Sequence, residues 1–442
     1  MTCFLGSFNA ESHWKEANYV SLPQMYDTQA EAIVQVMDEM QFLFCKSSND
    51  LLITSVAMNP MLKDYLKDIG FSFSCNDFDI RHDSGRVKTI FDQIIENELS
   101  FKDKWKALNI EGHDISPFSI AKVIISFCER YSITYNFPSY GTVVKVNSKS
   151  FSSQISTLYS PPYSIVIRSS EQLMSAGTKM LENGPILIKD SYGVSGKGIL
   201  KVTSLNILLR IVSYFSQQES ENKIIDFVIE QLLPKKRDFS SHLQIDKDGN
   251  IEILNVQQFH NSGFCFNSIE NADVNLLRLL HQNKYFNIVE NVGNALFNEG
   301  YFGPVCIDSL ITYDDKVFPI IEINARKSMG TLNTHLNYFL NKFKTDGFFT
   351  CIYLKSDKNI SFKDIFDIWD KEDLIFTTKK PYGIIPLSAN TVDINFKHNV
   401  GYPYKGRIYI SIIKSKSFTN EEILSAALYS LLNSSLPISA SL

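Results

Sequence analysis

Alternating apolar and polar residues on either side of residue 315 predict a β-hairpin. Residues 303–311 and 317–324 each have the pattern of a strand, and the polar residues 313–316 have the composition of a turn. If the turn is centred on Asp315, Asp308 and Glu322 lie directly opposite each other. Because side chains alternate between the two faces of a strand, one face of the hairpin is expected to be apolar. It consists of Val305, Ile307, Pro319, Ile321 and Ile323.

The second face of this hairpin has the donor set of a metal site. It carries Asp308, Glu322 and Asn324. Like charges that are directly opposed across two strands destabilise the pairing, so a cation between them would explain the arrangement. Two carboxylates and an amide oxygen are ligands that Mg²⁺ uses when substrate phosphates complete its shell. The alternative is a solvated acidic face, because a β-bulge would shift the register.

The chain before this hairpin has a mixed α/β pattern. Up to about residue 135, a strand-like run at 51–56 and a helical pattern at 115–131 indicate a first α/β domain. Residues 135–141 have the composition of a linker. The segment that follows is expected to contain a helix after Lys149, strands at 163–167, 185–189 and 199–202, and helices at 170–182 and 204–218, with Ser170 as the N-cap of the first of these two.

Further strands and helices are expected in the second half. A strand at 226–234 leads to a hairpin of 240–245 and 251–257, and one long helix is expected over 272–299. After the carboxylate hairpin, the pattern predicts a helix at 331–344, strands at 349–353 and 406–411, and a closing helix at 420–432. The inward face of that helix is expected to carry Ile423, Leu424, Ala427, Leu428, Leu431 and Leu432.

Composition narrows the class of protein. With 442 residues, 44% hydrophobic and 21% charged, and a formal charge of -5, the chain resembles a globular protein of about two to four domains. Its basic residues are scattered, so neither nucleic acid nor a membrane surface is expected as a partner. No export signal or membrane span is apparent, and the seven cysteines are dispersed without a CxxC pair. A reducing cytoplasm is therefore the expected location.

A phosphate-binding loop is predicted at residues 189–198. Lys189 ends a strand, and Gly193, Gly196 and Gly198 allow backbone N–H groups to converge on an anion. Ser195 and Lys197 lie between these glycines, and Lys197 adds positive charge. The spacing matches neither a Walker A loop nor a dinucleotide-binding fingerprint. The alternative is a plain hairpin loop.

The order of these segments resembles the ATP-grasp ligases. The resemblance covers residues 143–345 and rests on the lysine-bearing strand, the glycine-rich loop, the strand that ends in Glu230-Gln231-Leu232-Leu233, and Asp308 followed by Glu322-Ile323-Asn324. The phrases at 146–149, 189–198 and 322–326 are similar to the natural-product branch, which includes butirosin-type glutamate:acyl-carrier-protein ligases and pheganomycin-type peptide ligases.

This resemblance implies an α/β (α+β) ATP-grasp fold with four parts. They are an N-terminal pre-ATP-grasp α/β domain at 1–140, a small lid at 141–228, a core with the Mg-ATP site at 229–345, and a C-terminal family-specific α/β segment at 346–442.

The resemblance also implies roles for individual residues. Lys149 would reach the α-phosphate and Lys189 the α- and β-phosphates of ATP. Residues Glu230, Gln231, Leu232 and Leu233 would form the hinge at the adenine edge, and Asp238 would bind the ribose. The glycine-rich loop would close over the β- and γ-phosphates, and Asp308, Glu322 and Asn324 would hold one or two Mg²⁺ ions.

Arg326 is expected to bind the substrate carboxylate or the acyl phosphate. Many members of the family carry a further arginine two residues before the first metal-binding acid, where this chain has Cys306. Arg326 would therefore do that work alone, and with Lys189 and Lys197 it makes up the expected catalytic set.

The implied reaction activates an amino-acid or peptide carboxylate as an acyl phosphate and transfers it to an amine or to a carrier-protein phosphopantetheine thiol. Expected partners are that carboxylate substrate, an acyl carrier protein in the thiol case, and a second copy of the chain in a homodimer. Two alternatives remain open, a nucleotide-binding regulatory or scaffold protein and an ATP-dependent small-molecule kinase. The sequence does not identify the carboxylate, the acceptor or the pathway.

Other polar residues have weaker interpretations. His242, Gln244, Gln257 and Gln258 could line the acceptor site or lie on ordinary sheet surface. His260, His281, His335 and His398 lack metal-ligand spacing and are expected to be structural or exposed. The basic run 235–237 could contact phosphate or a carrier protein, although a solvated turn is expected. No Ser-His-Asp or Cys-His arrangement indicates covalent catalysis.

Overall fold

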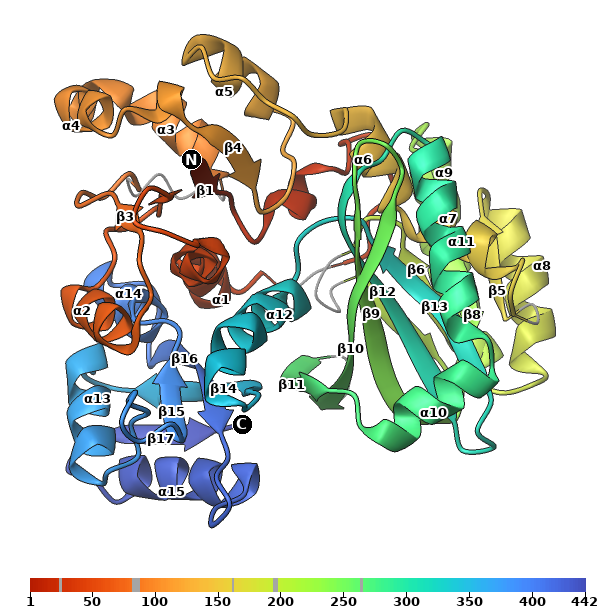
Figure 1. Cartoon of the computed structure of the whole chain (residues 1–442). Helices are drawn as coiled ribbons and strands as arrows, with labels where there is room; N and C mark the ends of the chain where they lie inside the picture. Colours follow the sequence, from red (N-terminus) through yellow and green to blue (C-terminus); the bar gives the residue numbers. More distant parts are fainter. Residues whose placement is uncertain (24–25, 82–87, 161–162, 194–197, 263–264) are drawn as a thin grey trace.

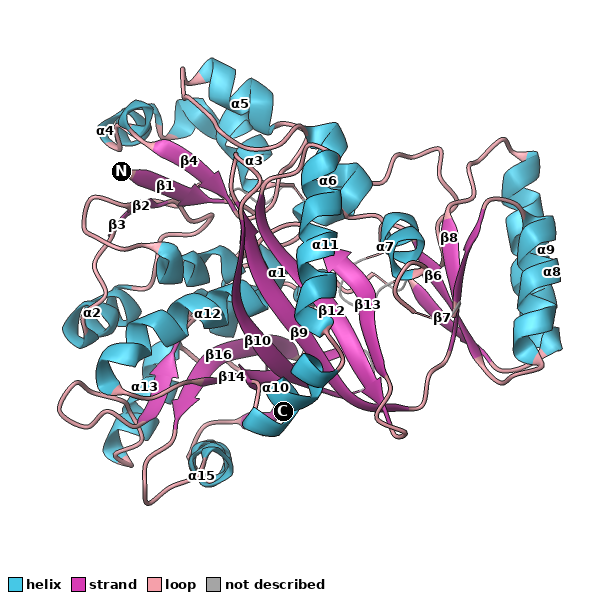
Figure 2. Ribbon diagram, turned by 45° about the vertical axis from the view of Figure 1, so that its right-hand side comes forward, coloured by secondary structure: helices cyan, strands magenta, loops and turns pink. Residues whose placement is uncertain are grey.

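The computed structural model describes residues 1–23, 26–81, 88–160, 163–193, 198–262 and 265–442. Within these ranges the strands form three sheets. Figure 1 shows a small N-terminal sheet, a long central sheet and, at the right, a separate small sheet with its helices. Figure 2 shows the same arrangement from a second direction. The mixed α/β fold class predicted from the sequence is confirmed.

The N-terminal sheet is parallel and has the order β3-β2-β1-β4. Its strands are β1 (Thr2–Leu5), β2 (Leu51–Leu52), β3 (Ser74–Cys75) and β4 (Asp114–Pro117). The strand expected at 51–56 is wrong beyond Leu52, because Thr54 and Ser55 donate their N–H groups to the side chains of Asn76 and Asp38. The helical pattern at 115–131 divides into β4 and α5 (Ile124–Arg130).

Helices surround this N-terminal sheet. They are α1 (Thr28–Gln35), α2 (Pro60–Ile69), α3 (Ile90–Asn97) and α4 (Lys102–Ala107), together with α5 and the short 3₁₀ helices η1 (Ala10–His13), η2 (Met37–Phe44), η3 (Glu98–Ser100) and η4 (Ile110–Gly112). The linker expected at 135–141 ends where α6 (Tyr140–Val146) begins, and α7 (Lys149–Ser156) follows as predicted.

The segment predicted as the lid, and called the lid below, contains an antiparallel sheet of order β5-β8-β6-β7. This sheet consists of β5 (Ser164–Ile167), β6 (Ile186–Asp190), β7 (Ile199–Val202) and β8 (Phe227–Gln231), with α8 (Ser170–Leu181) and α9 (Leu205–Ser220) on its outer side (Figure 2). The elements agree with the sequence prediction, but the expected N-cap is wrong. The side chain of Ser169 accepts the N–H of Gln172, whereas Ser170 donates to Glu219.

The central sheet has nine strands in the described residues. β9 (Lys235–Ile245), β10 (Ile251–Ser262), β11 (Cys265–Asn271), β12 (Gly303–Thr312) and β13 (Val317–Asn324) make up its first part, in the order β13-β12-β9-β10-β11. The sheet continues from β11 to β14 (Phe348–Ser356), β16 (Tyr404–Ile413) and β15 (Gly383–Pro386). The strand β17 (Ile438–Ser441) also pairs with β14. The predicted core and C-terminal segment therefore share one sheet.

The long helix expected at 272–299 is two helices, α10 (Val274–Gln282) and α11 (Tyr285–Asn298). The helix is interrupted at Lys284, whose φ is +53°. This turn directs Tyr285 inward, where its hydroxyl bonds to the hydroxyls of Ser241 and Ser309, each at 2.9 Å. A helical periodicity does not reveal such a break, because the apolar pattern continues across it.

The remaining helices are α12 (Met329–Leu340), η5 (Asn341–Phe343), α13 (Phe362–Lys371), α14 (Asn390–Lys397) and α15 (Asn420–Leu432). The bounds of α15 agree with the prediction, although Leu432 is 52% exposed and does not belong to the inward face. No described helix is both long and apolar enough to span a membrane.

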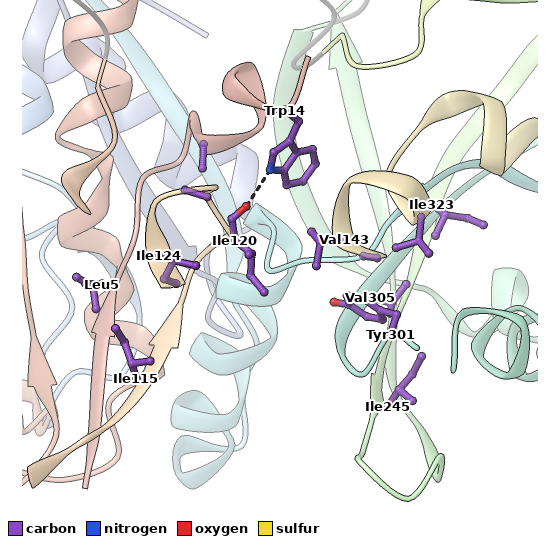
Figure 3. Packing of buried hydrophobic residues seen from close by; sticks show 14 of the residues in the cluster. Leu5, Trp14, Ile115, Ile120, Ile124, Val143, Ile245, Tyr301, Val305 and Ile323 are labelled. Atoms are coloured by element: carbon purple, nitrogen blue, oxygen red, sulfur yellow. Dashed lines mark hydrogen bonds between the residues drawn. The ribbon is translucent and has the colours of Figure 1, made fainter. Parts of the chain in front are cut away.

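Two large hydrophobic clusters join parts that are distant in the sequence. One packs Ile124 and Val143 in the same core as Ile245 and Ile323 of the central sheet (Figure 3). The other joins η2 and β2 to β14 and β16. The N-terminal part therefore packs against both the first and the last strands of the central sheet.

Candidate nucleotide and metal site

The carboxylate hairpin has the predicted register around Asp308 and Glu322. Asp308 pairs with Glu322, and Cys306 with Asn324. Phe318 pairs with Leu310, so β13 has two extra residues, a bulge, between Phe318 and Glu322. The alternation of side chains therefore changes in this stretch, and Ile320 joins the large core with Ile307 and Ile323. The expectation that Ile321 shares this face is wrong, because it packs with Tyr163 and Phe318 instead.

Asp308 is held by its neighbours on the polar face. Asn324 donates from Nδ2 to Asp308 Oδ2 at 2.8 Å, and the Cys306 thiol lies 3.4 Å from Oδ1. Burial and the facing Glu322 carboxylate raise the pKa of Asp308 to about 7. The Glu322 carboxylate therefore opposes the ionisation of Asp308, and a cation bound between the two would compensate this charge.

Lys149 joins this hairpin to the glycine-rich loop. It is the first residue of α7, whose N-cap Ser148 accepts the N–H of Phe151. Its ammonium, on a side chain that is 8% exposed, donates to Glu322 Oε1 at 2.9 Å and to the carbonyl of Gly193 at 2.6 Å. Burial opposes the ionisation of Glu322, but the positive charge of Lys149, assisted by other cations nearby, outweighs it and lowers its pKa.

Lys189 forms a buried ion pair with Glu230 across β6 and β8. The distance from Nζ to Oε2 is 2.5 Å, and each side chain is 8% exposed. Lys189 also contributes to the positive potential at Glu322. The two lysines predicted to bind phosphate therefore act on the same region, with Glu322 at its centre.

The hinge residues after β8 use their backbone groups within the lid. Gln231 donates its N–H to the carbonyl of Tyr163 at 2.8 Å, and Leu232 donates to Pro185 at 2.9 Å. The Glu230 carboxylate binds Lys189, as described above. The adenine-binding roles of residues 230–233 stay predictions.

The glycine-rich loop begins and ends in one tight backbone arrangement. Asp190 donates its N–H to the carbonyl of Gly198 at 2.8 Å, and its own carbonyl accepts the N–H of Gly193 at 3.0 Å. Gly198 has a φ of +83°, and a Cβ there would lie 3.1 Å from the Cβ of Asp190. Three predicted binding residues of this loop, Ser195, Gly196 and Lys197, lie outside the described residues.

Asp238 lies on β9 near the carboxylate hairpin. It pairs in register with Leu310 of β12, and its negative charge contributes to the raised pKa of Asp308. Its carboxylate accepts a hydrogen bond from Lys235 at 2.6 Å. The ribose-binding role of Asp238 stays a prediction.

Arg326 has an unexpected partner in the N-terminal part. Its Nε lies 2.5 Å from Glu11 Oε1, and its Nη2 donates to Glu11 Oε2 at 2.7 Å. Burial opposes the charge of Arg326, but Glu11 outweighs this effect and raises its pKa. Sequence reasoning missed Glu11, because no local motif marks it and 315 residues separate it from Arg326.

The predicted acceptor-site residues divide into two groups. His242 is buried, with Nε2 3.0 Å from Ser240 Oγ and 3.9 Å from Cys306 Sγ, and burial lowers its pKa to about 3. Gln257 donates to the carbonyl of Gly330 on α12 at 3.0 Å. In contrast, Gln258 binds Glu270, and Gln244 binds the carbonyl of Ile245. Of these four residues, only His242 and Gln257 lie near the site: His242 lies beside Cys306, close to Asp308, and Gln257 contacts α12.

The basic run 235–237 is paired with acids. Lys235 binds Asp238, Lys236 binds Asp315, and Arg237 binds Asp273. The three residues are solvent-exposed or partly exposed but begin strand β9, so the expectation of a turn is wrong.

The donor set of the hairpin fits a divalent cation bound together with a nucleotide. Within the described residues no group of three or more His, Cys, Asp or Glu side chains has the geometry of a metal site. A cation here would therefore use Asp308 and Glu322, with the amide oxygen of Asn324 and phosphate oxygens as its further ligands. Lys149 and Lys189, which act on Glu322, supply positive charge for those phosphates.

Comparison with known proteins identifies the fold. Residues 145–332 match the family model "Carbamoyl-phosphate synthase L chain, ATP binding domain". The structure is similar to biotin carboxylase from Campylobacter jejuni, solved with a β,γ-ATP compound, with a TM-score of 0.53 and 13% identity over 93% of this chain and 90% of the other. The chain has the ATP-grasp fold.

A second ATP-grasp structure is N5-carboxyaminoimidazole synthase from Aspergillus clavatus, solved with ADP and 5-aminoimidazole ribonucleotide. It matches with a TM-score of 0.50 and 8% identity, covering 87% of this chain and 98% of that protein. Among curated proteins, the [butirosin acyl-carrier protein]–L-glutamate ligase of Niallia circulans is 25% identical over 323 residues, which are 71% of this chain and 69% of the relative. The resemblance to ATP-grasp ligases predicted from the sequence is confirmed.

Proposed function

We propose that this ATP-grasp protein is an ATP- and Mg²⁺-dependent ligase. It activates an amino-acid or peptide carboxylate as an acyl phosphate and transfers the acyl group to an amine or to the phosphopantetheine thiol of a carrier protein. The observation that carries the proposal is the opposition of Asp308 and Glu322 in one hairpin, with Lys149 bridging Glu322 to the glycine-rich loop. The curated relative, which by its name ligates glutamate to an acyl carrier protein, supports the thiol variant.

The residues of the site suit the first half of this reaction. A carboxylate is a poor acceptor of the γ-phosphoryl group, because both carry negative charge. Bound Mg²⁺ would neutralise part of the phosphate charge and orient the triphosphate. Lys149 and Lys189 add fixed positive charge, and their burial makes this charge more effective than it would be in water. Catalysis then consists mainly of positioning and charge stabilisation.

The second half requires a group that stabilises the acyl phosphate and the oxyanion that forms when the acceptor attacks. Arg326 lies two residues after Asn324 and contributes to the electrostatic potential at both Asp308 and Glu322. A guanidinium can bind a carboxylate or phosphate through two donors at once. We therefore assign Arg326 to the acyl group and the lysines to the nucleotide.

Hydroxylamine trapping tests this function. The protein is incubated with ATP, Mg²⁺ and hydroxylamine and with a panel of amino acids that includes L-glutamate, and both the hydroxamate and the nucleotide products are measured. A ligase of this type forms a hydroxamate together with ADP and phosphate. Formation of AMP and pyrophosphate would refute the acyl-phosphate route, and a stable phosphorylated product without hydroxamate would favour the kinase alternative.

Glutamate can then be presented with a phosphopantetheinylated carrier protein or with a small amine. Glutamylation of the carrier, detected by mass, supports the thiol variant. Reaction with the amine alone supports the amide variant. Arg326→Ala should lower either transfer far more than it weakens nucleotide binding.

A further inference from the structure

The segment from Glu11 to Leu22 connects the N-terminal part to both sides of the proposed site. It follows β1, and its position is fixed by Trp14, whose indole N–H donates to the carbonyl of Ile120 at 2.8 Å (Figure 3). Both residues are buried in the large core. The side chains of Glu11 and Lys15 therefore start from an anchored backbone.

Glu11 holds the guanidinium of Arg326 by an ion pair and one hydrogen bond, which Arg326 Nη2 donates. The contacts run from Arg326 Nε and Nη2 to the two carboxylate oxygens of Glu11, at 2.5 and 2.7 Å. The Glu11 side chain is 9% exposed and the Arg326 side chain 16% exposed. An ion pair with a charge-assisted hydrogen bond between two largely buried side chains holds the guanidinium in place.

Lys15 makes the corresponding contact on the nucleotide side. Its ammonium donates to Asp190 Oδ2, and also to the carbonyl of Val20 at 2.6 Å. Asp190 is the base of the glycine-rich loop, because its backbone binds both Gly193 and Gly198, and its Oδ1 accepts the N–H of Tyr192 at 3.1 Å. The Asp190 side chain is 3% exposed.

The rest of the segment is built into the lid. Val20 donates its N–H to the carbonyl of Ile224 at 2.9 Å, and Tyr19 packs edge-on against Tyr192 with ring centroids 5.8 Å apart. Val20 and Leu22 are buried in the hydrophobic core of the lid. Twelve consecutive residues, 11–22, thus contact the arginine after β13, the base of the glycine-rich loop and the lid core.

We propose that Glu11 and Lys15 are positioning residues of the ligase: Glu11 orients Arg326 toward the acyl group, and Lys15 fixes Asp190, at the base of the glycine-rich loop, on the nucleotide side. The inference rests on the proposed function and adds to it a role for the N-terminal segment. The two roles can be measured separately, because Glu11 acts on binding of the carboxylate substrate and Lys15 acts on binding of the nucleotide.

The Glu11 half is tested with Glu11→Gln, alone and combined with Arg326→Ala. The carboxylate that gives the strongest hydroxamate signal is used, and the affinity for ADP with Mg²⁺ is measured by titration calorimetry. Because small misplacements of a positioned group are costly, Glu11→Gln should lower hydroxamate formation by about 10- to 100-fold, with unchanged affinity for ADP. In the Arg326→Ala background it should have no further effect. An equal, independent loss in both backgrounds would overturn the role of Glu11.

The Lys15 half is tested with Lys15→Met by the same ADP titration. The variant should bind ADP with Mg²⁺ about tenfold more weakly, since a mispositioned loop loses part of its phosphate contacts. Lys15→Met should have no further effect in an Asp190→Asn background. Unchanged ADP affinity in folded Lys15→Met protein would overturn the role of Lys15. Lys145→Gln, which breaks an exposed ion pair with Glu299, serves as the matched control and should leave both readouts unchanged.

A purely structural role gives a different pattern. In that case Glu11→Gln and Lys15→Met would lower the melting temperature and would change the hydroxamate yield and the ADP affinity together, which contradicts the proposal. If Lys15→Met does not fold, Lys15→Arg replaces it, and its retained charge should keep ADP affinity near that of the natural sequence. If the unmodified protein binds ADP but forms no hydroxamate with any acid, the proposed function fails, while the ADP titrations still decide the role of Lys15.

Discussion

The ammonium of Lys149 lies 2.9 Å from Oε1 of Glu322 and joins the first turn of α7 to strand β13. The same ammonium reaches the carbonyl of Gly193, at the start of the glycine-rich loop. One cation thus contacts the loop predicted to cover phosphates and the acid predicted to hold the metal. Through these two contacts Lys149 connects the predicted phosphate-binding and metal-binding parts of the site.

Substitution of Glu322 tests the metal assignment. Glu322→Gln keeps the shape of the side chain but removes the charge that a divalent cation would require. We expect Mg²⁺-dependent turnover to fall by at least about 100-fold, in the range typical for loss of one electrostatic group, while the circular dichroism spectrum stays unchanged. Glu252→Gln, on an exposed position of β10, is the matched control. Retained turnover in Glu322→Gln would remove Glu322 from the metal site.

The buried pair of Lys189 and Glu230 allows stability and binding to be separated. Lys189→Met leaves Glu230 as an uncompensated buried charge, which typically costs about 3 to 5 kcal/mol of unfolding free energy. Lys189→Met/Glu230→Gln removes that charge and should recover most of the stability in urea denaturation. Nucleotide affinity should stay low in both variants. Recovery of affinity with the second substitution would contradict a direct phosphate contact by Lys189.

The close packing of α12 against His242 predicts that a larger residue at Gly330 destabilises the protein. A Cβ at this position would lie 2.3 Å from Cε1 and 2.4 Å from Nε2 of His242, so Gly330→Ala forces the ring or the helix to move. Overpacking of this kind typically costs about 1 to 3 kcal/mol. Gly141→Ala is the control, because a Cβ there meets no atom within 4 Å. Equal unfolding midpoints for the two variants would contradict the close contact.

The contact between η2 and α14 predicts a pH dependence of stability. Glu39 accepts the N–H groups of Ala389 and Asn390 at 2.7 and 2.8 Å, and burial raises its pKa from 4.5 to about 8. The unfolded chain therefore loses this proton near pH 4.5 and the folded protein only near pH 8, so Glu39 should reduce stability as the pH rises between these values. The slope has an upper limit of about 1.4 kcal/mol per pH unit.

Glu39→Gln should remove this contribution while keeping an acceptor for the helix N–H groups. Thermal unfolding at pH 5 and pH 8 checks the prediction: the variant should lose less stability between the two values than the natural sequence does. Glu372→Gln, at an exposed position after α13, should behave like the natural sequence. A parallel pH dependence in all three proteins would contradict the raised pKa of Glu39.

The local parts of the site could be predicted from the sequence. Asp308 and Glu322 are separated by a short turn, so the alternation of the two strands was sufficient to bring them together. The strands and helices of the lid followed from the same kind of local pattern. A bulge was an open alternative for this hairpin, but its position in β13 could not be predicted, because Phe318 and Ile321 pack there against Tyr163, which is distant in the sequence.

Long-range contacts could not be predicted without the fold. The pairing of Glu11 with Arg326 and of Lys15 with Asp190 joins residues 315 and 175 positions apart. Their sequence surroundings have no motif, and the N-terminal segment therefore suggested no chemistry. The continuation of the central sheet from β11 into β14 has the same cause, since strand pairing between distant segments leaves no local signal.

The most direct test of the account is a crystal structure with a non-hydrolysable ATP analogue and Mn²⁺ in place of Mg²⁺. If Asp308 and Glu322 hold the metal, an anomalous scattering peak lies between them, in direct contact with a carboxylate oxygen of each, with the triphosphate beneath the glycine-rich loop. A nucleotide bound elsewhere, or a metal peak in contact with neither carboxylate, would contradict it.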